Sequence, residues 1–294
     1  MAKKFKIHAK NYGFIGIVLT VLIVYTLILG TMIYLALTTS LKEYIDFKLN
    51  PIGLPEQLWF QNYVDAFSAF QVKIEGNTRT VYLLEMLGNS VIYSVGCAIT
   101  ATLMPCLVSY LVAKYDEALN GFVYYTVIVA MILPIVGALP SEIQIAKQLG
   151  LYNTRFGLVI MRASHLGTYF LIFLGTFKGL SDEYIEAATI DGAGQWQVMV
   201  QIVFPLIRTT IFAIFLLNFI GYWNEYQSPL IYMGDYPTAA VGLFRYVHNA
   251  SQSGASSMTL QMAGCMILFL PIFILFVLFK NVFMGNLTVG GIKG

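Results

Sequence analysis

The sequence predicts an all-α integral membrane protein that crosses the bilayer six times. Of its 294 residues, 58% are hydrophobic and only 11% are charged, whereas about 25% are charged in a soluble domain. A mean hydropathy of +0.73 implies more apolar surface than one soluble core buries. A series of apolar stretches, each near the roughly 20 residues that span a bilayer, covers residues 13–38, 87–113, 121–140, 156–177, 206–225 and 260–280.

These six stretches are not equally uniform. Arg162 and His165 interrupt the fourth, and Arg208 lies near the start of the fifth. Pro134 and Pro271 lie inside the third and the sixth, where each removes a backbone hydrogen bond and predicts a kink. The charged residues make the fourth and fifth stretches the weaker candidates for membrane spans.

The N-terminus sets the expected orientation. Lysines in MAKKFKIHAKNYG precede an uncharged run, residues 13–40, that is longer than the apolar core of a signal peptide. Lysines before a retained span predict a cytoplasmic N-terminus, and an even number of crossings returns the C-terminus to the same side. Residues 39–86 are then outside and look ordered, and residues 178–205 are inside. The chain divides into an N-terminal region with the first span, a transmembrane domain and a C-terminal tail: 1–86, 87–280 and 281–294.

Composition and spacing argue against several other classes of protein. A net charge of +2 without a long basic run predicts no nucleic-acid partner. The cysteines lie in apolar runs without metal-ligand spacing, which predicts neither a metal site nor a disulfide: Cys97, Cys106 and Cys265. The histidines are scattered, which disfavours a membrane enzyme with clustered catalytic groups: His8, His165 and His248. Residues 290–294 lack the G-x-x-x-x-G-K-[S/T] spacing of a phosphate-binding loop, so the chain is expected to have no ATPase site.

One polar, glycine-punctuated segment separates two apolar stretches: EYIEAATIDGAGQWQVMVQIVFPLIRTT, residues 183–210. Ser181 is a suitable N-cap for a short helix, and Gly192 and Gly194 are suitable residues to end it. A second amphipathic piece is expected from Gln195 to Pro205. Because the loop is acidic, a protein partner is favoured over an alternative in which the loop lies on anionic lipid headgroups.

The spacing within this segment is specific: Glu186-Ala187-Ala188, three residues, Gly192, nine residues, Ile202, one residue and Phe204-Pro205. It resembles the EAA signature of the permease subunits of ABC importers, in which leucine usually takes the place of Phe204. Further segments resemble the carbohydrate-uptake branch of that family, and most closely its maltose-type inner-membrane subunits: LGLYNTRFGLVI, FIGYWNEYQSPLIYM and GNLTVGGIKG.

The resemblance implies a type I ABC importer permease fold with a cytoplasmic coupling helix, in the cytoplasmic membrane of a bacterium. It implies a substrate that is a carbohydrate such as an oligosaccharide. The implied partners are a second homologous permease, two cytoplasmic ATPase subunits that use ATP and Mg, an extracytoplasmic solute-binding protein and membrane lipid; no cofactor is expected in this chain. Carried over by position, the residues that dock on the ATPase are Glu186, Ala187, Ala188, Asp191 and Gly192.

A substrate pathway is suggested by the fifth span. Asn218, Tyr222 and Glu225 lie at i, i+4 and i+7 and share one helix face, with Asn224 beside them. Sugars need such a mixture of aromatic rings and hydrogen-bonding groups. In the alternative interpretation asparagine bonds a neighbouring helix and aromatic residues form an interfacial belt. The belt is favoured for Trp223 and Tyr226, and both interpretations stay open for Asn218 and Tyr222.

Arg162 has two interpretations of its own. Its long side chain can extend outward to the membrane surface, which is the favoured one. Alternatively it lines the pathway and pairs with an acidic group or with an anionic sugar such as a uronate, because charges within a span usually mark functional sites.

Two other functions fit parts of the pattern. An ABC importer for polyamine, phosphate or an amino acid would carry the same EAA spacing. A stand-alone channel or secondary transporter would have six spans but no use for the loop.

Overall fold

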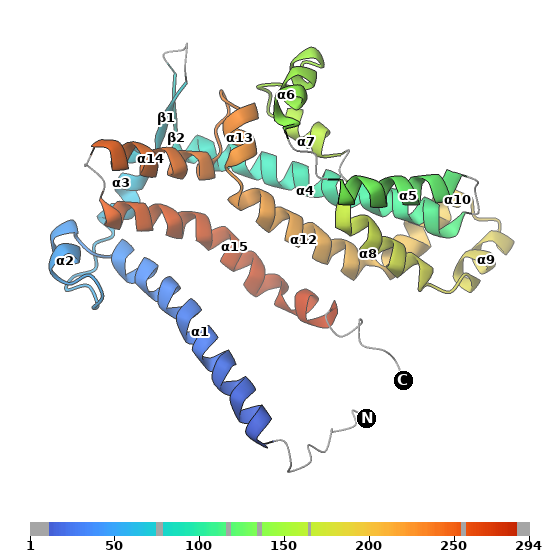
Figure 1. Cartoon of the computed structure of the whole chain (residues 1–294), viewed down its shortest axis with the longest axis horizontal. Helices are drawn as coiled ribbons and strands as arrows, with labels where there is room; N and C mark the ends of the chain where they lie inside the picture. Colours follow the sequence, from blue (N-terminus) through green and yellow to red (C-terminus); the bar gives the residue numbers. More distant parts are fainter. Residues whose placement is uncertain are drawn as a thin grey trace. The chain divides into compact units, whose positions relative to one another are not determined.

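The described part of the chain is mostly helical, as the computed structural model shows (Figure 1). It comprises residues 12–74, 79–115, 119–133, 137–163, 166–253 and 257–286. The predicted all-α fold class is confirmed; the described strands form a two-stranded antiparallel ribbon, β1 (Gln71–Lys73) and β2 (Thr80–Tyr82), in which Val72 pairs with Val81.

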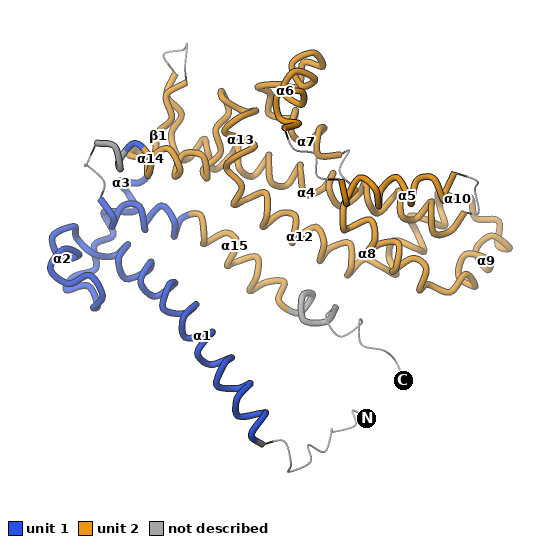
Figure 2. Tube along the Cα trace, viewed as in Figure 1, with its two compact units in different colours: residues 1–66, 249–267 blue, residues 67–248, 268–294 orange. Residues whose placement is uncertain are grey.

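The chain forms two compact units (Figure 2). Unit 1 holds residues 1–66 and 249–267, and unit 2 holds residues 67–248 and 268–294. The compact units are sets of residues that contact one another, whereas the predicted division at residues 86 and 280 separates stretches of sequence by their expected relation to the membrane. That division stays a prediction.

Unit 1 contains the first predicted span and the start of the segment that follows it. Helix α1 (Tyr12–Ser40) is apolar on all sides and exposes large side chains along its length, as expected of a helix that lies in lipid. Helices α2 (Tyr44–Leu49) and α3 (Gln61–Ala69) follow. The Asn62 side-chain amide donates to the carbonyls of Ser40, at 2.9 Å, and Lys42, at 2.7 Å. The segment after α1 is thus ordered, as predicted.

Unit 2 is built around the long helix α4 (Leu83–Lys114). Helices α7 (Gly157–Arg162), α8 (Gly167–Lys178) and α12 (Arg208–Asn224) pack against it. A small polar side chain of α4 stabilises the packing against α8: the Ser109 hydroxyl donates to the Phe170 carbonyl at 2.8 Å. Unit 2 also holds α5 (Leu119–Ile132), α6 (Leu139–Gln148), α9 (Glu183–Ile190), α10 (Gln195–Gln197), the π-helical η2 (Val198–Val203), α11 (Phe204–Leu206) and α13 (Gln227–Tyr232). Two further helices, α14 (Ala239–Ser253) and α15 (Met258–Asn286), each contain residues of both units.

The predicted spans differ in length and continuity. Among the described residues, three helical segments are long and apolar enough to cross a membrane: Gly13–Ser40, Leu83–Lys114 and Met258–Lys280. A fourth span is formed if the pair Gln195–Leu206 and Arg208–Asn224, which is bent by 75°, counts as one. The third prediction corresponds to α5, whose 14 residues are too few for a straight crossing; Pro134 lies outside the described residues.

The prediction of one continuous fourth span, residues 156–177, is wrong. Helix α7 ends at Arg162 and α8 begins at Gly167, which has a φ of +52°. A right-handed helix cannot continue through that backbone angle, which glycine adopts more easily than other residues. His165 lies outside the described residues.

Candidate functional site

Helix α9 has Asp182 as its N-cap, one residue after the predicted Ser181, and no side chain caps it there. The Ser181 hydroxyl oxygen accepts the Glu183 amide at 3.4 Å. Gly192 follows the helix with a φ of +83°, the left-handed geometry of a helix stop. Gly194 does not end α9 but precedes α10, where its amide donates to Gln197 Oε1 at 3.0 Å. We call residues 181–205 the EAA loop.

One face of the EAA loop is fixed in an apolar core. Ala188 of α9 is only 8% exposed, and Val198, Met199 and Val203 of η2 are also buried. They pack against side chains of α4, α8 and the start of α12: Cys106, Tyr110, Phe173, Phe177, Ile207 and Ile214. The loop is therefore a packed part of unit 2.

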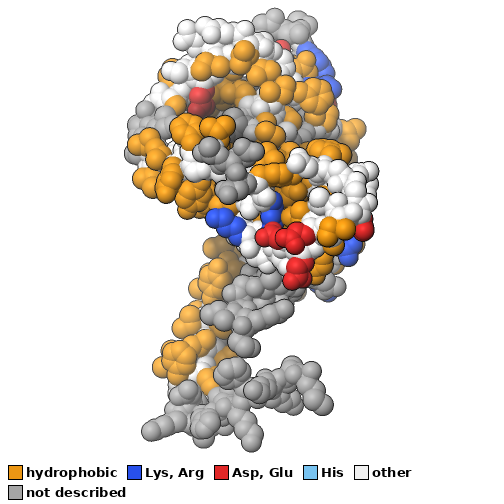
Figure 3. Space-filling model, turned by 90° about the vertical axis from the view of Figure 1, so that its right-hand side faces the viewer, with side chains coloured by type: hydrophobic (Ala, Val, Ile, Leu, Met, Phe, Trp, Pro, Cys, Tyr) orange, Lys and Arg blue, Asp and Glu red, His pale blue; other side chains and the backbone are white. Residues whose placement is uncertain are grey.

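The opposite face of the loop is exposed. Glu186, Ala187, Asp191 and Gly192 lie on it, whereas Ala188 faces inward, so the five residues assigned to docking do not share one surface. Large apolar side chains are exposed beside the acidic ones: Tyr184, Ile190 and Trp196. Figure 3 views the end of the molecule that carries α9 and α10, and acidic side chains gather there with hydrophobic ones around them.

A buried lysine anchors the start of the EAA loop, and sequence reasoning missed it. The Lys114 ammonium, at the end of α4, donates to the Leu180 carbonyl at 2.9 Å and to Asp182 Oδ1 at 2.6 Å. The Lys114 side chain is 5% exposed and that of Asp182 is 71% exposed. The sequence does show a lysine at the end of an apolar stretch, but it does not indicate which residue that lysine contacts.

A second polar group lies near the other end of α4. We call it the polar network: Tyr93 of α4, Arg162 of α7, Glu225 just after α12, and Ser228 of α13. The Tyr93 hydroxyl donates to Glu225 Oε2 at 2.6 Å, and the Ser228 hydroxyl donates to the other carboxylate oxygen. Arg162 Nη2 donates to Ser228 Oγ at 2.7 Å and lies 3.6 Å from Glu225 Oε1.

The structure brings only some of the predicted pathway residues together. Tyr222 lies beside the polar network: its ring is 5.8 Å from the Tyr93 ring, and the Arg162 guanidinium is 5.9 Å from its centre. Asn218 is buried and its side-chain amide donates to Thr102 Oγ1 of α4 at 3.1 Å, the helix-to-helix bond of the alternative interpretation. Asn224 is exposed and bonds the Ile220 carbonyl of its own helix at 2.9 Å.

Two expectations about side chains are wrong. The favoured interpretation of Arg162 placed its guanidinium at the membrane surface, but protein groups hold it, because Glu225 and Ser228 satisfy its charge within the chain. Trp223 does not belong to an interfacial belt. Its side chain is 4% exposed and its indole N–H donates to the Leu268 carbonyl of α15 at 3.0 Å. Tyr226 stacks on Phe244 at 4.4 Å.

The segment containing LGLYNTRFG packs on the end of α13. Asn153 has a φ of 58°; its side-chain amide donates to Asp235 Oδ2 at 2.7 Å, and its Oδ1 accepts the Asp235 amide at 2.9 Å. The Tyr232 hydroxyl donates to Glu142 Oε2 at 3.2 Å. Burial, and then the charge of Glu142, raises the pKa of Tyr232, so this hydroxyl stays protonated and remains a donor. These contacts hold α13 and therefore Ser228 in place.

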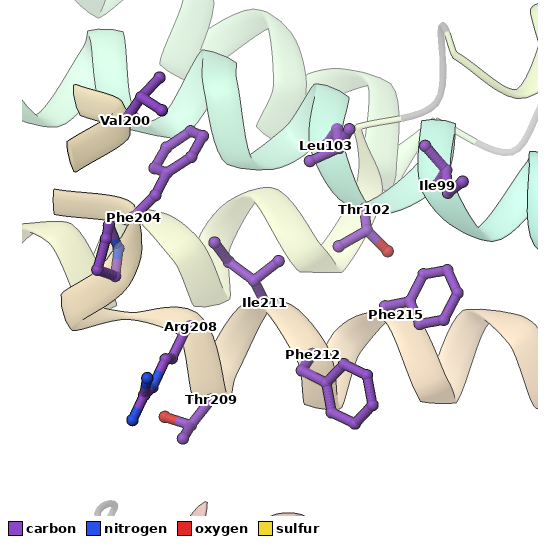
Figure 4. A pocket seen from close by; sticks show the side chains of 11 residues that line it. Ile99, Thr102, Leu103, Val200, Phe204, Arg208, Thr209, Ile211, Phe212 and Phe215 are labelled. Carbon is purple, nitrogen blue, oxygen red and sulfur yellow. The ribbon is translucent and has the colours of Figure 1, made fainter. Parts of the chain in front are cut away.

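A pocket of about 760 Å³ lies elsewhere in unit 2, between α4 and the segment from η2 to α12 (Figure 4). Its lining is mainly apolar, from residues such as Leu103, Phe212 and Phe215, with Arg208 at one end. None of the predicted pathway residues lines it, so it adds nothing to the assignment of a substrate site.

Curated relatives match two thirds or more of the chain, and two of them match nearly all of it. The diacetylchitobiose uptake system permease protein NgcG of Streptomyces coelicolor is 24% identical, over 92% of this chain and 86% of that protein. The probable starch degradation products transport system permease protein AmyC of Thermoanaerobacterium thermosulfurigenes is 24% identical, over 98% and 99%. The sn-glycerol-3-phosphate transport system permease protein UgpE of Yersinia pestis is 30% identical, over 66% and 68%.

A solved structure has the same fold. It is a chain of a bacterial ABC transporter involved in the import of the acidic polysaccharide alginate, with a TM-score of 0.73 and 19% identity over 94% of this chain and 98% of that one. A second structure of an alginate ABC transporter, in complex with an alginate pentasaccharide-bound periplasmic protein, gives a TM-score of 0.60 and 14% identity, over 96% and 97%. The likeness confirms the predicted permease fold.

The family assignment follows from the larger part of the chain. Residues 86–288 match the family described as the inner membrane component of binding-protein-dependent transport systems. The EAA spacing lies within that region, on an exposed helix fixed to the transmembrane core. This chain therefore belongs to the family of inner-membrane permease subunits of binding-protein-dependent ABC importers.

Proposed function

We propose that this permease imports a carbohydrate, and more narrowly an oligosaccharide, with energy that reaches it through the EAA loop. The observation that carries the proposal is the placement of α9, which exposes an acidic face and buries Ala188 in the core of unit 2. Relatives named for diacetylchitobiose and for starch degradation products support the substrate class.

The proposed transmission of force from the ATPase to the permease depends on how the EAA loop is packed and bonded to unit 2. A groove on a separate ATPase would receive the exposed residues Glu186, Ala187, Asp191 and Gly192. Ala188 would act from beneath by fixing the helix, since the apolar core and Lys114 both resist its displacement. A push on α9 would then reach α4 directly, because a close-packed interior transmits strain.

The remaining parts of the system are supplied by partners. We propose a second homologous permease that completes the pore, two ATPase subunits that bind ATP and Mg, and an extracytoplasmic solute-binding protein. The chain is then a transport subunit without an ATPase site of its own. Its termini and the EAA loop face the cytoplasm of a bacterium, on the same side of the cytoplasmic membrane as the ATPase.

The proposed substrate pathway passes the polar network. Tyr222 offers an aromatic face, and Glu225 and Arg162 offer polar groups that are 27% and 31% exposed. Asn224 is exposed one position earlier and can join them, whereas Asn218 acts through its bond to Thr102. The partner permease would supply the facing wall.

A second candidate substrate is a phosphorylated polyol. The relative named for sn-glycerol-3-phosphate is 30% identical, which favours it. The two candidates differ in charge, and a transport assay with both kinds of solute separates them.

The experiment is reconstitution of the complete system in proteoliposomes. Co-expression with the neighbouring permease, ATPase and binding-protein genes should yield a complex that accumulates a labelled neutral oligosaccharide only when ATP is present. Replacing Glu186 by Lys should release the ATPase and abolish uptake, whereas Lys178→Gln, a change of an exposed residue before the loop, should do neither. Uptake without ATP would overturn the proposal in favour of a secondary transporter, and uptake of glycerol phosphate alone would establish the second candidate.

A further inference from the structure

Arg162 ends helix α7 and Glu225 directly follows α12, and each lies beside a long uncharged stretch of sequence. From Gly157 to Phe177 the sequence contains no Asp, Glu, Lys or Arg other than Arg162, and none occurs from Thr209 to Asn224. Charges within a span are costly and usually mark a pathway. The structure places these two side chains together, although they come from different helices.

The polar network gives the Glu225 carboxylate two hydrogen bonds and the Arg162 guanidinium one. Glu225 accepts from Tyr93 and Ser228, and Ser228 in turn accepts from Arg162 at 2.7 Å. Ser228 therefore bridges an ion pair whose direct separation is 3.6 Å. Arg162 Nε, one of the five N–H donors of the guanidinium, is buried and has no partner among the described groups.

We propose that the Arg162–Glu225 pair makes the pathway selective for uncharged sugars. The inference rests on the proposed function and narrows its substrate class. Glu225 cancels the charge of Arg162, so a passing solute meets a polar surface without net charge. Both side chains are about three-tenths exposed, so a sugar hydroxyl can reach them.

An acidic sugar gains little binding affinity from the Arg162–Glu225 pair. A solute carboxylate that approaches Arg162 also approaches the Glu225 carboxylate, which lies 3.6 Å from the guanidinium. The repulsion between the two negative charges offsets the attraction to Arg162. The same argument holds for a phosphate group. The proposal thus argues against the phosphorylated polyol and against a uronate, even though Arg162 taken alone suggests an anionic substrate.

The test changes the charge balance in both directions. The complete permease–ATPase complex is placed in nanodiscs, and the solute-binding protein is left out so that its own specificity does not enter. Calorimetry then measures binding of three matched trimers: a neutral hexose, a hexuronate and an amino sugar. The parent should bind the neutral trimer at least about tenfold more tightly than the other two, the size of one charge-assisted hydrogen bond.

Two single variants should move the preference in opposite directions. Glu225→Gln leaves Arg162 uncompensated, and the affinity for the hexuronate relative to the neutral trimer should rise about tenfold. Arg162→Met leaves Glu225 uncompensated and should raise the relative affinity for the amino sugar by a similar factor. The double variant R162M/E225Q removes both charges and should return to the preference of the parent.

The outcomes separate this inference from the proposed function. If the parent binds none of the three trimers, the carbohydrate function and this inference both fail. If the parent binds the neutral trimer but neither single variant changes the ratios, only the charge-balance inference is overturned. Because the two single variants are predicted to act in opposite directions, a general loss of folding in one of them cannot imitate the expected result.

Discussion

The EAA loop and the polar network each contain one ion pair tied to α4, but the surroundings of the two pairs differ. At the EAA loop, Lys114 is buried and Asp182 is 71% exposed, and an apolar core does most of the holding. At the polar network, both charges are about three-tenths exposed and hydroxyl groups surround them. The first arrangement suits the transmission of force, and the second suits contact with a polar solute.

The largest effect is expected from overpacking beneath the EAA loop. Ala188→Phe inserts a ring beside Tyr110 and Phe177, which costs about 1–3 kcal/mol and displaces α9. ATP-driven uptake should fall about tenfold or more, and the melting temperature of the complex should drop. Ala187→Phe, on the exposed face, should leave the melting temperature unchanged and act only on ATPase binding. Equal melting temperatures for both variants would show that the core does not hold the loop.

The next largest effect concerns the ion pair at the loop. Lys114→Met removes two hydrogen bonds from a buried cation, and charge-assisted bonds of this kind contribute about 1.5–3 kcal/mol each at most. Asp182→Asn should cost only about 0–1 kcal/mol, because Asp182 is exposed and Lys114 keeps the Leu180 carbonyl. The difference between the two variants can be measured by thermal unfolding and by the ratio of ATP hydrolysed to solute transported. Equal effects of the two variants would contradict the assignment of Lys114 as the anchor.

The local features of these two regions could be predicted from the sequence. Gly192 follows the end of α9 as predicted, and the start of α9 lies within one residue of its prediction, because a cap and a left-handed turn depend on residues within a few positions of each other. The long apolar helices could also be predicted, because a continuous apolar stretch is a local property of the sequence. The EAA spacing predicts a docking surface on this loop, because a spaced motif is itself a local pattern, and the docking stays a prediction.

The contacts within each region could not be predicted, because they join distant parts of the chain. Lys114 and Asp182 are 68 residues apart, and Tyr93 and Glu225 are 132 apart. Helical periodicity places a residue on a face but does not say which helix lies opposite. For that reason Arg162 was expected at the membrane surface, and Trp223 in an interfacial belt, when each has a partner inside unit 2.

A moderate effect is expected from the polar network. Tyr93→Phe removes the hydroxyl that donates to Glu225 at 2.6 Å from a side chain that is 1% exposed. The loss should be about 1–2 kcal/mol, because Glu225 keeps Ser228 and Arg162. Tyr232→Phe removes a longer bond to Glu142, 3.2 Å, near the end of α13 and should cost less. If Tyr232→Phe lowers the free energy of unfolding more than Tyr93→Phe does, the polar network contributes less to stability than the contact between Tyr232 and Glu142.

The last contrast concerns Gly192, and it separates backbone strain from docking. Its φ is +83°, and a Cβ there would meet no atom within 4 Å, so the cost of Gly192→Val comes from the backbone alone, about 1–2 kcal/mol. Gly192→Asn should cost less, because asparagine tolerates this conformation, and Gly194→Ala is the control, since its φ of −69° suits any residue. If Gly192→Asn is as stable as the parent but no longer binds the ATPase, the turn itself is part of the docking surface. If Gly192→Val retains both full stability and full uptake, neither the strain nor the contact exists, and force must reach α4 by a route other than the end of α9.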